Sequence, residues 1–136
     1  MTRWLAASFV LGLAACATPQ ASAPACALGD PMVETQIFFG MSKPKGGQVS
    51  ARDWDAFVAR EVSPRFPEGF SVIDGAGFWR DGATQKTISE KSKVVVRLHP
   101  ASADADQAIV GIIDAYKRAF DQEAVLRVDR PVCATF

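Results

Sequence analysis

The sequence predicts an α+β domain in which helices cover one face of a single antiparallel sheet. Three observations support this fold class. The chain of 136 residues is long enough for one modest core, and 49% of its residues are apolar. Two segments carry apolar residues at helical spacing, and four other segments are rich in strand-forming residues.

The domain is predicted to begin with a strand and a helix. Residues 34–40 have the alternation of a strand. The first helix follows Ser50, a suitable N-cap, and runs to about Ser63, where Pro64 ends it. The apolar stripe of this helix is formed by Trp54, Phe57, Val58 and Val62.

A hairpin, a second helix and a last strand are predicted to follow. Residues 70–79 and 86–98 pair through a turn that contains glycine, and residues 124–128 form the last strand. Ser102 or Asp104 caps the second helix. The apolar stripe of that helix is formed by Ile109, Ile112, Ile113, Tyr116 and Phe120. The order βαββαβ is that of the ferredoxin-like arrangement, with a four-stranded sheet and two helices on one face.

The first sixteen residues predict export and lipidation. Arg3 precedes the apolar residues 4–14, which are too few to cross about 30 Å of hydrocarbon and read as a signal peptide over residues 1–15. Leu13-Ala14-Ala15-Cys16 is similar to the bacterial lipobox, in which the cysteine thiol takes a diacylglyceryl group before cleavage. We expect a lipid on Cys16 that anchors the chain in the membrane, and the alternative is an ordinary secretory signal cleaved at an Ala-x-Ala site. Ala17 favours the outer membrane facing the periplasm, since an inner-membrane retention signal usually has Asp there.

The rest of the chain divides into a tether and one domain. Residues 16–32 are rich in Ala, Pro and Ser and are predicted as the tether, and residues 33–136 as the domain. Cys26 and Cys133 are expected to form a disulfide in the oxidising export compartment. The topology agrees, because the first and last strands of a βαββαβ sheet are antiparallel neighbours. The alternative leaves Cys26 free in a mobile tether.

Short motifs between residues 34 and 128 resemble those of one family. They are Phe38-Phe39-Gly40, Trp54 with Phe57, Arg65-Phe66-Pro67-Glu68-Gly69, Gly77-Phe78-Trp79, Glu90-Lys91-Ser92-Lys93, Tyr116-Lys117 and Phe120-Asp121-Gln122-Glu123-Ala124-Val125. On these motifs the chain resembles the domain of unknown function 3574 family, a group of small bacterial exported proteins. The resemblance implies export and a single domain, and it implies no particular activity.

Motifs for catalysis or cofactor binding are missing from the sequence. His99 is the only histidine and is expected to be exposed at a strand end, and no His-Glu-x-x-His or Cys-x-x-Cys is present for zinc. The glycines around Lys43 and Lys45 lack the Gly-Lys-Ser/Thr ending of a phosphate loop. We therefore predict neither a metal nor a cofactor. Fifteen basic and fifteen acidic residues balance, which argues against nucleic acid as a partner.

Polar residues within the family-like motifs form a second group of candidates. Glu90, Lys93 and Glu123 are the members of this group, and a buried Glu–Lys pair among them is predicted. Such a pair would be structural or would serve acid–base chemistry, and we favour the structural interpretation.

The sheet face opposite the helices is predicted to bind a partner. Side chains alternate between the two faces of a strand, and we place Ile37, Phe39, Val94, Val96, Leu98, Leu126 and Val128 on the helix side. The opposite face is then formed by Gln36, Phe38, Val95, Arg97, Val125 and Arg127. Its two arginines suit an acidic or aromatic partner. As alternatives, the arginines pair with Glu34, Glu90 or Glu123, or the tether or a second copy covers this face.

Together these features predict a lipid-anchored protein of the cell envelope that works as an interaction or binding module. Its partner would be another envelope protein or a second copy of the chain. The alternative is a small enzyme or ligand carrier that uses a pocket on the sheet face. We favour the module because the sequence has one histidine, no nucleophile elbow and no cofactor motif.

Overall fold

A computed structural model of the chain describes residues 25–136. Its elements, in chain order, are β1 (Asp30–Gly40), α1 (Ala51–Phe57), the π-helical turn η1 (Val58–Val62), β2 (Ser71–Arg80), β3 (Thr87–His99), α2 (Ala103–Phe120) and β4 (Leu126–Ala134). The predicted signal peptide, Cys16 and the tether up to residue 24 lie outside the described residues. None of the helices within residues 25–136 is long and apolar enough to cross a membrane.

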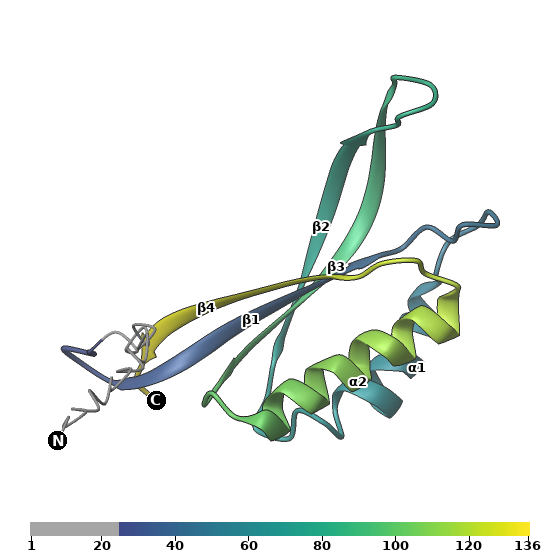
Figure 1. Ribbon diagram of the computed structural model, residues 1–136. Coiled ribbons are helices and arrows are strands. Elements are labelled where there is room, and N and C mark those ends of the chain that lie inside the picture. Colours follow the sequence, from purple (N-terminus) through teal and green to yellow (C-terminus); the bar gives the residue numbers. More distant parts are fainter. Residues whose placement is uncertain (1–24) are drawn as a thin grey trace, which may run out of the picture.

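The four strands form one antiparallel sheet in the order β2-β3-β1-β4. Both helices lie against the same face of this sheet, and the opposite face is open (Figure 1). The predicted α+β class, the order of elements and the antiparallel sheet are confirmed. β1 begins at Asp30, within the last residues of the predicted tether, and pairs with β4 as far as Ala134.

Local signals in the sequence account for the helix ends. The Ser50 hydroxyl accepts a hydrogen bond from the Asp53 N–H, and Ser102 does the same for Ala105 at the start of α2. At the end of α2, Asp121 adopts the left-handed conformation that closes many helices. These caps fix where each helix begins or ends above the sheet.

The hydrophobic core lies between the helices and the sheet and is aromatic at its centre. The ring of Phe39 lies 5.4 Å from Trp54, 5.9 Å from Phe57 and 4.7 Å from Tyr116, all in edge-on arrangements. The Tyr116 hydroxyl donates a hydrogen bond to the carbonyl of Gly40 at 2.8 Å. Burial, and then the nearby Glu90 carboxylate, raise the pKa of Tyr116.

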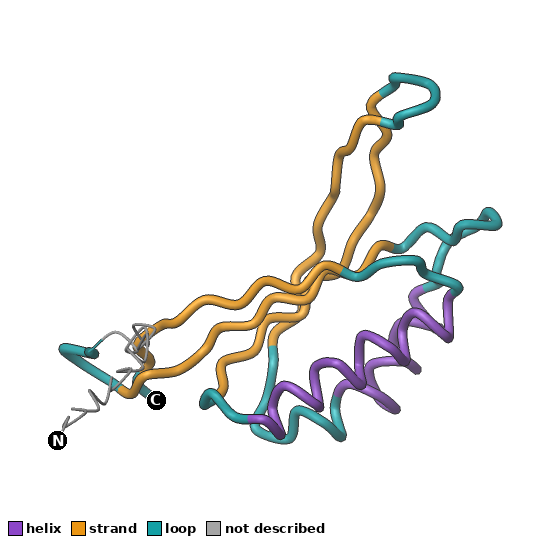
Figure 2. Tube along the Cα trace, viewed as in Figure 1, coloured by secondary structure: helices purple, strands orange, loops and turns teal. Residues whose placement is uncertain are grey.

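Part of the hairpin extends beyond the rest of the sheet. The pairing of β1 with β3 ends at Gly40 and Ser92, and after one further hydrogen bond from the Met41 N–H to the Lys91 carbonyl, β2 and β3 continue as a two-stranded hairpin. This part, residues 76–91, is called the arm, and it rises away from the helices (Figures 1 and 2). Phe78 and Trp79 of the arm are 70% and 49% exposed.

The strand register reverses the predicted orientation of β3 and β4. Val95 pairs across from Ile37 and Arg97 across from Thr35, so that both face the helices, and Val95 is fully buried. Arg127 of β4 also pairs across from Ile37 and reaches α2. The prediction was wrong by one residue because Val94-Val95-Val96 is a continuous apolar run that contains no alternation to read.

Candidate ligand-binding site

One end of the helix-covered side of the sheet is polar. Thr35, Arg97 and His99 are buried there, with 1%, 8% and 4% of their surfaces exposed. The register of β1 brings them together, because Thr35 pairs with Arg97 on one side and with Asp129 on the other. His99 was predicted to be exposed, and this was wrong. The alternation that buries Val95 continues through Arg97 to His99.

Hydrogen bonds connect His99 to Asp129 through Thr35. The Thr35 hydroxyl donates to Asp129 Oδ1 at 2.5 Å and lies 2.8 Å from His99 Nε2. His99 Nδ1 lies 2.9 Å from the carbonyl oxygen of Pro100, which can only accept. The Thr35 hydroxyl therefore links the His99 ring to the Asp129 carboxylate.

The same chain of hydrogen bonds continues to α2. Arg127 Nε donates to Asp129 Oδ1 at 3.1 Å, and Arg127 Nη1 donates to Asp106 Oδ1 at 2.6 Å. Burial raises the pKa of Asp129, but hydrogen bonds from Thr35 and Arg127 outweigh that effect and hold the pKa below its usual range. The acceptors and donors of this network thus tie α2, β4, β1 and β3 together.

Arg97 is the least satisfied member of the polar group. Its side chain is 9% exposed, and Nη2 donates to Glu68 Oε2 at 2.9 Å. The guanidinium lies over the ring of Phe66, with its central carbon 4.3 Å from the ring centroid. Nε and Nη1 are buried and have no hydrogen-bond partner in the described part of the chain. Because a buried donor without an acceptor is costly, Arg97 calls for a further anionic or polar partner.

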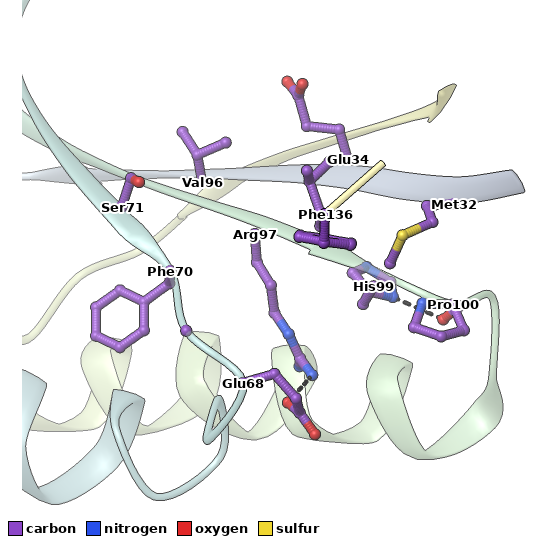
Figure 3. Close-up of a pocket in the computed structure, with 12 residues that line it drawn as sticks. Met32, Glu34, Glu68, Phe70, Ser71, Val96, Arg97, His99, Pro100 and Phe136 are labelled. Carbon is purple, nitrogen blue, oxygen red and sulfur yellow. Dashed lines mark hydrogen bonds and ion pairs between the residues drawn. The ribbon is translucent and has the colours of Figure 1, made fainter. Parts of the chain in front are cut away.

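A pocket of about 700 Å³ lies beside Arg97. It occupies a notch in the sheet, because β2 pairs with β3 only as far as Val96 and leaves Arg97, Leu98 and His99 with a free edge on that side. Figure 3 shows Arg97 reaching from β3 toward Glu68 in this notch. The apolar residues of its walls are Met32, Phe70, Val96, Leu98, Pro100 and Phe136.

A smaller and more polar pocket of about 370 Å³ also borders Arg97 and His99. Its other polar lining residues include Arg65, Glu68 and Asp104. The larger pocket has apolar walls and a few polar groups at defined positions, which is typical of small-molecule sites. Within residues 25–136, no group of three His, Cys, Asp or Glu side chains is placed to hold a metal ion.

The residues predicted to form one partner-binding face are divided between the two sides of the sheet. Phe38 is half-buried on the open side, whereas Val95, Arg97 and Arg127 lie on the helix side and Val125 packs against the core. The arginines do not pair with any of the acidic residues considered for them, Glu34, Glu90 and Glu123. Their partners are Glu68, Asp106 and Asp129.

The predicted buried pair among Glu90, Lys93 and Glu123 is also wrong. Glu90 accepts a hydrogen bond from the backbone N–H of Ser42 at 2.8 Å, Lys93 pairs with Asp74, and Glu123 is exposed. A side chain at Gly40 would lie 2.8 Å from Glu90 Oε1, so the glycine is what lets this carboxylate approach β1.

The predicted disulfide is confirmed. Cys26 and Cys133 are bonded, with their Cα atoms 5.6 Å apart and a sequence separation of 107 residues. The bond lies where Pro31 and Cys133 pair, at the outer end of β1 and β4. The bond therefore links the segment before β1 to β4 at the end of the sheet where β1 begins.

Four of the residues at the site were not selected from the sequence: Thr35, Glu68, His99 and Asp129. Thr35 stands at even spacing from Ile37 and Phe39 and therefore shares their face, where a buried hydroxyl indicates a buried polar partner. The sequence did not reveal the register of β3, which places Arg97 and His99 on the helix side of the sheet.

Comparisons with known proteins identify a family and a fold. A family model described as "Protein of unknown function (DUF3574)" matches residues 34–136, which confirms the resemblance predicted from the motifs. No curated protein matches the chain. A solved structure of a phage SAM lyase in complex with S-methyl-5'-thioadenosine is similar, with a TM-score of 0.56 and 16% identity over 79% of this chain and 93% of that one. The apo state of a phage SAM lyase gives a TM-score of 0.53 at 16% identity, over 83% and 98% of the two chains. At this identity the likeness concerns the fold.

Proposed function

Because the chain belongs to the DUF3574 family, whose description gives no activity, we propose a function from the site itself: a lipid-anchored binding module of the cell envelope. In this proposal the pocket beside Arg97 holds a small organic anion that combines a carboxylate with an apolar group. Strand order and helix placement support the ferredoxin-like arrangement for this module.

The observation that carries the proposal is the state of Arg97. Among residues 25–136, two nitrogens of the guanidinium have no hydrogen-bond partner, and Glu68, the one residue that forms an ion pair with it, is 71% exposed and free to yield to a ligand. A carboxylate pairs well with a guanidinium, because the hydrogen bonds between them are charge-assisted. Phe70, Leu98 and Phe136 would contact the apolar part of the ligand.

Lipid anchoring rests on the sequence and on the compartment. The lipobox-like Leu13-Ala14-Ala15-Cys16 predicts the modified cysteine. The bond between Cys26 and Cys133 supports an oxidising compartment such as the periplasm. Mass spectrometry of the mature N-terminus tests this part: a diacylated Cys16 supports it, and an unmodified chain that begins elsewhere contradicts it.

Ligand binding is tested by calorimetry on the mature protein in detergent. The probes are acetate, hexanoate, benzoate and, as a neutral match to benzoate, benzyl alcohol. We expect benzoate or hexanoate to bind and benzyl alcohol to bind at least about tenfold more weakly, because a hydrogen bond to a charged group contributes about 1.5–3 kcal/mol. Arg97→Met should weaken binding by a similar factor.

Arg118→Met is the matched control, because Arg118 is an exposed arginine on α2 outside the pocket. This variant should bind the carboxylates as the unaltered protein does. Binding that is equal for benzoate and benzyl alcohol, binding that survives Arg97→Met, or no binding of any carboxylate probe would each contradict the proposal.

The second candidate is a small enzyme or ligand carrier that takes a neutral aromatic ligand. It is favoured by the likeness in fold to a phage SAM lyase that was solved with S-methyl-5'-thioadenosine. The same calorimetry therefore includes this nucleoside. Binding of the nucleoside that is unaffected by Arg97→Met, with no binding of carboxylates, would favour the second candidate over the first.

A further inference from the structure

The open face of the sheet is apolar across all four strands. One row of side chains crosses the sheet, because the register pairs Ile73 with Val94, Val94 with Phe38, and Phe38 with Leu126. The adjacent row, by the same pairings, consists of Ser71, Val96, Gln36 and Val128. These side chains alternate along their strands with the buried Ile37, Phe39 and Val95 and therefore lie on the side of the sheet away from the helices.

Much of this surface is exposed in a single copy of the chain. Ile73 is 54% exposed, Leu126 58% and Val128 43%. A solvated sheet face usually carries polar residues at such positions, whereas an apolar face packs against a second layer. A contiguous apolar patch of this kind marks an interaction surface.

The face continues onto the arm. Trp79 follows Ile73 at an even spacing in β2 and therefore lies on the same side of the strand, and it pairs across from Ile88. Trp79 and Ile88 are 49% and 36% exposed. Because a two-stranded hairpin alone is marginally stable in water, the arm gains most from a neighbour that covers these residues.

We propose that the open face and the arm are the interface between two copies of this chain. The size of the face fits this occupant. The strands are staggered, and outside the arm they supply about 33 residues, which at about 4.8 Å by 3.3 Å each give roughly 500 Å² for the face, against about 800 Å² for each partner of a standard interface. The arm supplies the remainder.

Charge also fits a second copy. The full chain has a formal net charge of zero, and loss of Arg3 with the predicted signal peptide leaves the mature chain at −1, so two copies repel each other little at long range. The charged residues beside these two rows include Glu34 and Arg130, which pair with each other at 2.8 Å. An apolar face with balanced charges at its margin is compatible with a two-fold interface, in which each copy buries the same patch.

The face borders the ligand site, because Ser71 and Val96 line both, but Leu126 and Val128 do not line the pocket beside Arg97 and therefore test the interface alone. The experiment uses the mature protein, with its mass measured by sedimentation equilibrium in a density-matched detergent. We expect a dimer, and we expect Leu126→Lys and Val128→Lys to weaken association at least tenfold.

Val110→Lys is the matched control. Val110 lies on α2 and, at 43%, is as exposed as Val128, but it is on the helix side of the molecule. The same two positions then receive a photo-crosslinking amino acid in intact cells, where no detergent competes with the interface. Position 128 should give an adduct of twice the chain mass, and position 110 should give none.

Several results would overturn the proposal. One is a monomer in sedimentation together with no dimer-sized adduct at position 128. Another is an equal loss of association in Val110→Lys and Val128→Lys. An adduct of a different mass would assign the face to another envelope protein. A monomer whose position 128 crosslinks only to lipid would assign it to the membrane surface.

Discussion

The two ends of the layer between sheet and helices are built from the same strands but in different ways. In β1 the buried side chains pass from Phe39 through Ile37 to Thr35. Around Phe39 the layer is a cluster of aromatic rings, whereas around Thr35 it is a network of hydrogen bonds and ion pairs. Apolar burial stabilises a fold directly, but a buried ionic group is seldom more stabilising than an apolar side chain of its size. The comparison indicates that the aromatic end holds the domain together and that the polar end serves another purpose.

The largest expected effect is the loss of an aromatic ring from the aromatic end. Phe39→Ala should lower the free energy of unfolding by about 3–5 kcal/mol, because it removes a fully buried ring and leaves a cavity. The matched control is Phe78→Ala in the arm, where the ring is 70% exposed. Urea denaturation followed by circular dichroism measures both. Equal losses in the two variants would remove the distinction between core and arm.

The disulfide should contribute the next largest effect, at the polar end of the sheet. Replacing Cys26 and Cys133 with serine should lower the free energy of unfolding by about 2–4 kcal/mol, because the bond closes a long loop in the unfolded chain. The unaltered protein must be exported before it is assayed, so that the disulfide can form. Thiol titration under non-reducing conditions then shows whether the bond is present. Two free thiols in the unaltered protein would contradict the bond, and an unchanged stability would show that it constrains little.

The third effect separates stability from binding. Arg97→Met should leave the free energy of unfolding unchanged or raise it by up to about 2 kcal/mol, because it removes a buried charge and leaves Glu68 in water. Ligand binding should fall in the same variant. Thermal denaturation with and without benzoate measures both quantities. A loss of more than about 2 kcal/mol would instead make Arg97 a structural residue.

The sequence was informative about the aromatic end and misleading about the polar end. The stripes of Trp54 and Phe57 and of Ile109, Ile112 and Tyr116 follow from helical spacing alone, and all of these residues are buried. The strand order follows from the order of elements, and it placed Cys26 near Cys133. Spacing could not orient β3, since three valines in succession are compatible with either register.

Polar residues that lie inside the fold are the part that sequence patterns predict least well. Arg97 and His99 were expected at the surface because residues of these types usually lie there. They are buried because the register supplies Glu68 and the ring of Phe66 to Arg97, and Thr35 and Pro100 to His99. Thr35 and His99 are separated by tens of residues in the sequence. A contact between such residues can be predicted only once the strand pairing is known.

The smallest expected effect is the pH dependence that the polar end confers on stability. The pKa of Asp129 is lower in the folded chain than in the unfolded one, where it is about 3.9. A carboxyl group of this kind contributes stability that is present above the unfolded pKa and is lost as the pH falls through the folded pKa. Asp129→Asn should therefore lose less stability than the unaltered protein between pH 5 and pH 2, roughly the window in which aspartates titrate. The control is Asp114→Asn on the exposed side of α2, which should follow the unaltered protein. Urea midpoints at each pH measure the slope, and equal slopes for Asp129→Asn and Asp114→Asn would mean that the network through Thr35 does not stabilise the carboxylate.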